Sequence, residues 1–414
     1  MSNTLADYQT LELTNEPEIE LLLCCARTRL DEKITKDIKT LVQSEIDWDY
    51  LLEIAQQHGV IPLLYQSLTN TCQGIVPQSI WSELQWQFQT NALRNQLMCQ
   101  KLIEIINLFN SHDINAISFK GLTLAASAYG NIALRQFGDL DILIAPENIN
   151  QATEIITEQG YVKSQSLVET ELKPYAQSPL FFNSPQYQGS YDFTHQSGTI
   201  NIELHWSLTR KDVSFPVKFQ QLWTEKVQLI LLNTEIYNFS PEDLLIFLCL
   251  HGSKHCWEEM KWICDVAEII ESHQEIDWNQ VLHKSGILGV RRMLNIGLIL
   301  TQKLLGTTFP EVILQEINRD KIAQSLAQKV ETWLFSENVT IKDRHIFIYQ
   351  SRELFTDKMR YLIHWLIIPT DKEWEFLNLP NYLYFLYYLI RPIRLVIQFS
   401  KISCQCLIQQ VTSR

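Results

Sequence analysis

Residues 133–146 read ALRQFGDLDILIAP, and they place Asp139 and Asp141 at the start of an apolar run that Pro146 closes. The run predicts a β-strand. Because strand side chains alternate between faces, both aspartates are expected on one face and apolar residues on the other, namely Leu140, Ile142 and Ile144. Two neighbouring carboxylates repel each other unless a cation neutralises them, and Mg²⁺ prefers such oxygens. The alternative is a pair of solvated aspartates at a strand end.

A third carboxylate lies in TINIELHWSL, residues 199–208. Its alternation predicts a strand with Ile200, Ile202, Leu204 and Trp206 on the apolar face. The polar face carries Glu203 between Asn201 and His205. Three carboxylates on adjacent strands can hold two metal ions about 3.5 to 4 Å apart. That arrangement suits in-line phosphoryl or nucleotidyl transfer, so Asp139, Asp141 and Glu203 are the candidate catalytic and metal-binding residues.

The segment ISFKGLTLAASAYG, residues 117–130, predicts a strand, a turn at Gly121 and a helix of about two turns. The start of such a helix offers backbone N–H groups to a phosphate. Lys120 and Arg135 are the nearest fixed cations, so both are candidate nucleotide-binding residues together with Gly121. A plain turn flanked by solvated surface charges remains the alternative interpretation.

The whole chain predicts an α+β protein that is mostly helical, with a small α/β domain between helical regions. Periodic apolar residues predict helices before residue 114, including a long one that begins near Ser79, with Asp47 as a helix N-cap. Within the α/β block, YDFTH and TINIELHWSLT predict a hairpin, and the polar residues 165–190 predict a loop or lid. The expected domains are an N-terminal helical region, an α/β domain, a helical domain and a C-terminal mixed segment, at residues 1–114, 115–208, 209–337 and 338–414.

These pieces resemble nucleotidyltransferases of the DNA polymerase beta superfamily. More closely, the chain resembles the bacterial family of uncharacterised nucleotidyltransferases. The resemblance rests on an ordered set of motifs between residues 119 and 394: FKGLTLAASAYG, LRQFGDLDILI, IELHWSL, LHGSKHCWEEMKWICDVAEI and DKEWEFLNLPNYLYFLYYLIRPIRL. It implies that Asp139 and Asp141 bind Mg²⁺ or Mn²⁺, that Glu203 is the third acid, and that a nucleoside triphosphate such as ATP is the donor.

The turn departs from the superfamily pattern, because Lys120-Gly121 stands where Gly-Ser is usual and Thr123 is the nearest hydroxyl. The interval from Gly121 to Asp139 is also longer than is typical. These departures leave open an altered or lost activity. Glu203 in place of the commoner aspartate can still bind a metal.

The second helical region contains LHGSKHCWEEMKWICDVAEI, which places His251 and His255 four residues apart on one helix face beside Lys254. A zinc site would need a third ligand, for which Asp265 and Glu258 are nominal candidates. A structural role for the two histidines is the second interpretation. In the third, this face lines the cleft opposite the aspartates, and Lys254 contacts the nucleotide, as the resemblance implies.

Composition limits the other possibilities. The 414-residue chain has a formal net charge of −13, so binding to long nucleic acid is not expected. The first 20 residues show no signal peptide, and no uncharged apolar run of about 18 residues predicts a transmembrane helix. Nine cysteines without a CxxC motif indicate reduced thiols in a cytoplasmic protein.

Two C-terminal stretches have a structural and a functional interpretation. YLYFLYYLIRPIRLVIQF, residues 382–399, is either a packed core helix or a membrane-surface helix, and the core helix is favoured. IIPTDKEWEFLNLP, residues 367–380, is interpreted as a loop that packs Trp374 and Phe376 onto the body.

The predicted function is metal-dependent transfer of a nucleotidyl group from a nucleoside triphosphate to an acceptor, with Glu203 as a possible base. A small molecule or peptide is the favoured acceptor. Two alternatives stay open: kinase-like transfer of the γ-phosphoryl group at the same site, and an inactive binding or scaffold protein on the same fold. The sequence leaves the acceptor, the preferred nucleotide and the oligomeric state undetermined.

Overall fold

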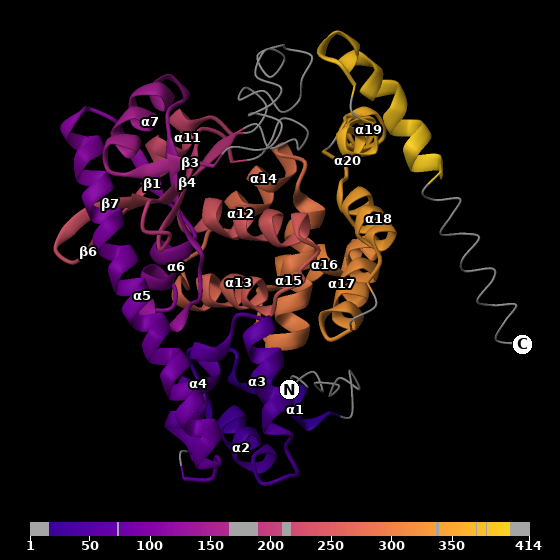
Figure 1. Ribbon diagram of the computed structural model, residues 1–414. Coiled ribbons are helices and arrows are strands. Elements are labelled where there is room, and N and C mark those ends of the chain that lie inside the picture. The colour runs from indigo at the N-terminus through magenta and orange to yellow at the C-terminus, as the bar shows by residue number, and fades with distance from the viewer. Residues whose placement is uncertain are drawn as a thin grey trace, which may run out of the picture.

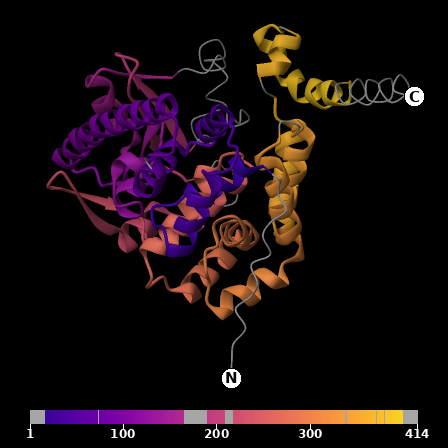
Figure 2. The ribbon, with the colours of Figure 1, turned by 90° about the horizontal axis from the view of Figure 1, so that it is seen from below.

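The computed structural model describes residues 16–72, 74–164, 189–208, 217–336, 339–369, 371–377 and 379–397. Helices make up most of it, and a single five-stranded sheet lies to one side of the helical body (Figures 1 and 2). This confirms the α+β class with a small sheet set among helices.

Five helices precede the sheet in the part of the chain that the structure describes. Asp47 caps the third of them by accepting a hydrogen bond from the Tyr50 N–H, as its position in the sequence predicts. The fifth has 34 residues, which corresponds to a length of about 50 Å. The bounds are α1 (Pro17–Cys25), α2 (Glu32–Leu41), α3 (Trp48–Gln57), α4 (Ile61–Cys72) and α5 (Gln78–Ser111).

The sheet has the strand order β1-β2-β5-β4-β3, and β2 and β5 form its parallel pair. The predicted hairpin is confirmed, because β4 and β5 pair antiparallel. Residues 165–188, most of the predicted loop or lid, lie outside the described residues. The strands are β1 (Ala116–Ser118), β2 (Asp139–Ile144), β3 (Tyr161–Lys163), β4 (Ser190–His195) and β5 (Asn201–His205); the helical segments among them are α6 (Gly121–Ser127), η1 (Ile132–Leu134), η2 (Pro146–Asn148) and α7 (Ile149–Glu158).

The two faces of the sheet meet different cores. The apolar face packs against the C-terminal half of α5 and against α7, and it contributes Leu140, Ile142 and Ile202 to that core. On the other face, Leu143 joins the main helical core, which extends from α1 to α18 (Ile341–Ser351). The alternation predicted for both strands is therefore confirmed. It directs the strand carboxylates toward the helical body.

The segments after the sheet run through a second hairpin into the central helices and then into a C-terminal group (Figure 1). No described helix is long and apolar enough to span a membrane, and the seven cysteines among the described residues are free thiols. The division into four domains stays a prediction. The elements are α11 (Phe219–Glu225), β6 (Val227–Leu231), β7 (Thr234–Asn238), α12 (Pro241–Lys254), α13 (Met260–Ser272), α14 (Trp278–Ile287), α15 (Arg291–Leu305), α16 (Glu311–Arg319), α17 (Lys321–Leu334), α18, α19 (Phe355–Ile367), α20 (Asp371–Phe376), η3 (Asn381–Leu386) and a last helix at 387–397.

The core-helix prediction for 382–399 is wrong in the described part of that stretch. Four apolar side chains of the last helix are exposed to solvent: Leu389, Ile393, Val396 and Ile397. The loop predicted at 367–380 is partly helical, because α20 lies within it, and Phe376 is 61% exposed instead of packed on the body. In neither stretch did the apolar composition show which side chains are buried.

A buried ion pair joins the sheet region to the helical body. Arg135 precedes β2, and its Nε and Nη2 donate to the two carboxylate oxygens of Asp265 in α13 at 2.6 and 2.7 Å. The Tyr129 hydroxyl donates to the same carboxylate at 2.7 Å. All three side chains are buried. Because a bidentate pair fixes both distance and angle, this contact sets the position of the segment that leads into β2.

Asp265→Asn is expected to lower the free energy of unfolding by about 3–5 kcal/mol, because it leaves the Arg135 guanidinium buried without its counter-ion. The check is the midpoint of urea unfolding, with Glu104→Gln in the exposed Lys101–Glu104 pair as the control. The control should change stability by less than about 0.5 kcal/mol. An equally small effect of Asp265→Asn would show that the pair does not join the two regions.

Candidate functional site

The turn between β1 and α6 brings a lysine to the aspartates. Lys120 has φ +57° and ψ −153°, a backbone conformation that suits glycine, and Gly121 follows with φ +37°. A Cβ on Gly121 would lie 3.3 Å from the carbonyl oxygen of Asp139. Strain at Lys120 costs about 1–3 kcal/mol and persists only where the surroundings enforce it. The turn is therefore built for close approach to β2.

A row of carboxylates crosses three strands on the face that looks toward the helical body. Asp141 in β2 lies opposite Glu203 in β5, and Glu203 lies opposite Asp192 in β4. Neighbouring strands are about 4.8 Å apart, so the three side chains stand side by side. Asp139 precedes Asp141 by two residues and shares its face. We call these four residues the acidic row; like charges at such spacing are unfavourable unless cations offset them.

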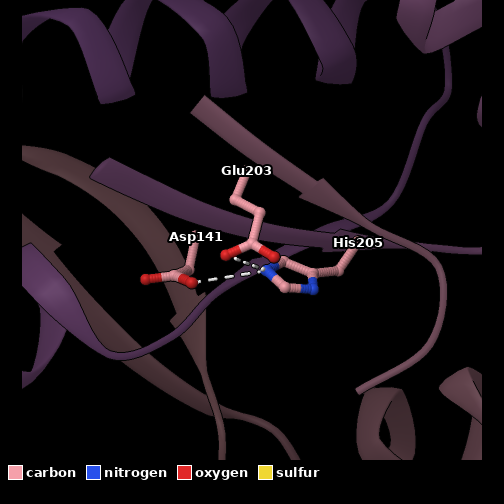
Figure 3. Close-up of side chains that lie close together, drawn as sticks. All are labelled: Asp141, Glu203 and His205. Carbon is pink, nitrogen blue, oxygen red and sulfur yellow. Dashed lines mark hydrogen bonds and ion pairs between the residues drawn. The ribbon is translucent and has the colours of Figure 1, made fainter. Parts of the chain in front are cut away.

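Two cations meet the acidic row, and Figure 3 shows one of them, His205, between Asp141 and Glu203. Lys120 Nζ lies 2.7 Å from Asp141 Oδ1. His205 Nε2 lies 3.3 Å from the same oxygen and 3.4 Å from Glu203 Oε2. The Ser190 hydroxyl donates to Glu203 Oε1 at 2.8 Å. These contacts neutralise Asp141 and Glu203 within the protein itself.

The pKa values follow from this crowding. Burial lowers the pKa of His205, but the Glu203 and Asp141 carboxylates outweigh burial and raise it to about 9. Burial raises the pKa of Glu203, but His205, followed by Lys120 and Ser190, brings it well below its ordinary value. For Lys120, burial is again outweighed by Asp141 and the neighbouring acids, and its pKa rises. At neutral pH, Lys120 and His205 are therefore both positively charged, and Glu203 is ionised.

Asp139 is the acid that these cations neutralise least. Burial and the nearby Asp141 charge raise its pKa from 3.8 to about 6, and Lys120 only partly opposes them. Arg94 in α5 is within electrostatic reach of Asp139 but is itself half-buried. The first carboxylate of the acidic row thus carries an unfavourable negative charge at neutral pH.

Side chains of α5 hold the segment that leads into Asp139. Asn91 donates to the carbonyl oxygen of Ala133 at 2.8 Å, and Asn95 donates to that of Arg135 at 2.8 Å. Arg94 donates to the carbonyl oxygens of Phe137 and Gly138. Backbone groups 133–138 are therefore satisfied by one helix instead of a strand partner, which fixes the entry into β2.

The end of α12 lies next to the site. Phe119 is fully buried and contacts the rings of both His205 and Phe247, at centroid distances of 5.1 and 5.2 Å. His251 and His255 continue along the same helix with ring centroids 4.7 Å apart. Burial and then the charges of neighbouring lysines, including Lys120, lower the pKa of each histidine. Both imidazole rings are therefore neutral at neutral pH.

A zinc site on these histidines has no third ligand among the described residues. The nominal candidates are engaged elsewhere, because Asp265 pairs with Arg135 and Glu258 pairs with Arg344. The remaining interpretations are a structural role and a cleft-lining role. Lys254 ends α12 and is exposed, so its predicted contact with a nucleotide stays a prediction.

The structure brings together most of the predicted site residues: Asp139, Asp141, Glu203, Lys120 and Gly121. Arg135 does not join them, because its guanidinium is buried on Asp265 and holds the chain instead. Its predicted nucleotide contact stays a prediction that this pairing does not support. The Thr123 hydroxyl is directed to the carbonyl oxygen of Lys120 at 2.9 Å and does not face the acidic row.

Three residues of the site were missed from the sequence. His205 was placed on the polar face of its strand, but only the register of β2 with β5 shows that it meets Asp141. Asp192 could have been noticed from its position in YDFTH, the strand that forms a hairpin with β5. Arg94 carries no sequence signal, because the helix that presents it lies 45 residues before Asp139.

The donor set fits a metal ion. Among the described residues, one group of three or more potential ligands lies close together: Asp141, Glu203 and His205, each offering an atom within 4.8 Å of the others. Asp141 Oδ2 is buried and has no hydrogen-bond partner. An orphaned, buried carboxylate oxygen is costly. Carboxylate oxygens are also the ligands that hard divalent cations prefer.

Comparison with known proteins identifies the family to which the chain belongs. The chain matches a family described as uncharacterised nucleotidyltransferase over residues 44–306, a span that covers α3 to α15 and the whole sheet. Because the match covers more than half of the chain, the protein belongs to that family, and the general class of the protein is nucleotidyltransferase. No curated protein matches the chain.

Asp139→Asn is expected to stabilise the metal-free protein at pH 7 and to leave its stability unchanged near pH 4. The folded pKa of Asp139, about 6, exceeds its ordinary value of 3.8, so folding stability falls as pH rises between these values and stays lower above them. Asparagine avoids that loss, and a gain of up to about 3 kcal/mol in the free energy of unfolding follows.

Urea unfolding at the two pH values, with the exposed Glu154→Gln as a control, measures this gain. An Asp139→Asn variant no more stable than the wild type at pH 7 would contradict the crowding of charge at Asp139.

Proposed function

We propose that the protein transfers a nucleotidyl group from a nucleoside triphosphate to an acceptor, with Mg²⁺ or Mn²⁺ bound at the acidic row. The observation that carries the proposal is the convergence of Asp139, Asp141 and Glu203 beside the Lys120-Gly121 turn. The orphaned Asp141 Oδ2 supports a cation at this place. The family supplies the reaction class.

Asp139, Asp141 and Glu203 would hold the metal, with His205 as a further ligand once it has lost its proton. A divalent cation bound there would supply positive charge to the triphosphate and to the acceptor oxygen. Because metal binding requires deprotonated ligands, its affinity should rise as Asp139 and His205 lose their protons.

The chain's own residues would act as follows. Lys120 leaves Asp141 and pairs with phosphate oxygens of the donor. The acceptor oxygen attacks the α-phosphorus, the bond from that phosphorus to the bridging oxygen breaks, and pyrophosphate leaves. Asp192 takes the acceptor's proton, because it is the member of the acidic row that solvent reaches, and partial desolvation followed by the Glu203 charge raises its pKa. Glu203 is less suited to that role, since its pKa is low.

The acceptor is proposed to be a small molecule or a peptide. The net charge of −13 disfavours a long nucleic acid, whose phosphates the chain would repel. ATP binding, the cytoplasmic location and the bacterial origin remain expectations from the sequence, and the preferred nucleotide stays undetermined.

A second candidate function is an inactive nucleotidyltransferase that binds a partner instead. One observation favours it: the Lys120 ammonium group already lies among the carboxylates, where it can substitute for a metal ion. The strained backbone of Lys120 fits this candidate as well. A glycine at this position would relieve the strain, but it would also remove the charge that offsets the carboxylates. The two candidates differ in whether a divalent cation can displace the lysine.

Product analysis tests the reaction class without knowledge of the acceptor. Slow hydrolysis of ATP with Mg²⁺, with water as the acceptor, should give AMP and pyrophosphate in ³¹P NMR spectra. Asp139→Asn/Asp141→Asn should abolish it, while Asp192→Asn should lower turnover and keep binding of a non-hydrolysable ATP analogue. ADP and phosphate would instead indicate γ-phosphoryl transfer. No turnover and no binding of the analogue would contradict the proposal.

Lys120→Met is expected to raise the affinity for Mn²⁺ alone about tenfold, because it removes the cation that competes for Asp141. The same variant should bind the ATP analogue with Mn²⁺ at least tenfold more weakly, since a phosphate contact is lost. Calorimetric titration measures both, and Lys101→Met on the surface of α5 is the matched control.

Wild-type protein that binds no Mn²⁺, together with a Lys120→Met variant that does, would show that the lysine permanently replaces the metal. That result would favour the inactive candidate over the proposed enzyme.

A further inference from the structure

The last helix, residues 387–397, buries Arg391 beside Tyr387 and Leu395 and exposes several of its apolar side chains to solvent. Arg391 is buried, and both Arg391 and Arg394 pair with Glu373, which is 0% exposed. On the outer side, Leu389 and Ile393 are 62% and 60% exposed. A helix on the surface of a water-soluble protein normally has the opposite arrangement.

The neighbouring helix α19 has the same arrangement. Its exposed positions include Phe355, Met359 and Ile363, four residues apart, so they form one stripe along the helix. Asp357 and Tyr361 face inward and are buried. The apolar C-terminal face is the set of exposed residues Phe355, Met359, Ile363, Leu366, Ile367, Phe376, Leu377, Phe385, Leu389, Ile393, Val396 and Ile397.

This face lies away from the sheet. Both views show the last helix, in yellow, at the outer edge of the molecule and on the side opposite α5 (Figures 1 and 2). Single exposed apolar residues are ordinary, but a dozen on adjacent C-terminal segments form a surface that monomeric proteins rarely leave in water. The apolar C-terminal face therefore needs a binding partner, independently of the function proposed for the acidic row.

Charge indicates which partner suits the face. Residues 341–414 contain ten lysines and arginines and six aspartates and glutamates, whereas the whole chain has a net charge of −13. Two of those acids, Asp357 and Glu373, are buried, and so are two of the basic residues, Arg352 and Arg391, so the buried side chains leave the excess of positive charge unchanged. Lys372 and Arg360 are exposed beside the apolar residues. The C-terminal part of the chain is thus basic in composition, and its described helices expose apolar side chains, on a protein that is acidic as a whole.

A lipid surface matches this chemistry better than a second copy does. Contact between two copies would place the same excess of positive charge on both sides of the interface. Anionic headgroups would complement it, and the acyl boundary would cover the apolar stripes.

We propose that the apolar C-terminal face docks on the surface of an anionic lipid bilayer, with α19 and the last helix lying in the plane of the interface. The described helices are too short or too polar to cross the bilayer, so the contact is peripheral. It anchors the protein by side chains that the sheet and the acidic row do not use.

Sedimentation of the full chain with vesicles tests the proposal. The protein should bind vesicles of phosphatidylcholine with phosphatidylglycerol, bind vesicles of phosphatidylcholine alone at least tenfold more weakly, and lose affinity as salt rises. Leu389→Gln/Ile393→Gln should weaken binding to the anionic vesicles about tenfold or more. The control is Leu93→Gln/Ile287→Gln, which changes two equally exposed apolar residues on α5 and α14 and should not alter binding.

Light scattering on the same proteins examines the competing partner. A wild-type dimer that Leu389→Gln/Ile393→Gln converts to a monomer would assign the face to self-association and overturn the proposal. Absence of binding to the anionic vesicles, or equal binding to both kinds of vesicle, would overturn it as well.

Discussion

The repulsion among the carboxylates of the acidic row is the constraint on which the site depends. Register places Asp141, Glu203 and Asp192 side by side, and the chain offsets their charge with Lys120 and His205. The offset is uneven, because Asp139 keeps a raised pKa and Asp141 Oδ2 keeps no partner. Without a further cation this arrangement is costly. That cost is the physical basis for proposing a metal ion at the acidic row.

The surrounding helices make this arrangement rigid. Helix α5 binds the backbone before β2 through Asn91, Arg94 and Asn95, and α13 binds Arg135 through Asp265. The strained turn at Lys120 is held from the other side by β1 and α6. The extensive helical frame around a small sheet therefore has a function of its own, since it holds charged groups in positions that they would not adopt alone.

The sequence predicted what depends on local pattern. Alternation along β2 and β5 identified Asp139, Asp141 and Glu203 on the correct faces, and the glycine at 121 identified the turn. The sequence could not predict the features that depend on contacts between distant segments. Arg135 was interpreted as a phosphate ligand because its partner Asp265 lies 130 residues away. The stretch at 382–399 was interpreted as core, because an apolar run does not show which side of the helix meets the protein.

The most direct test of the central claim is the anomalous diffraction of crystals grown with Mn²⁺ and a non-hydrolysable ATP analogue. We expect a manganese peak among Asp139, Asp141 and Glu203, with Lys120 Nζ moved from Asp141 to a phosphate oxygen. Lys120 still paired with Asp141, and no manganese at the acidic row, would contradict the claim.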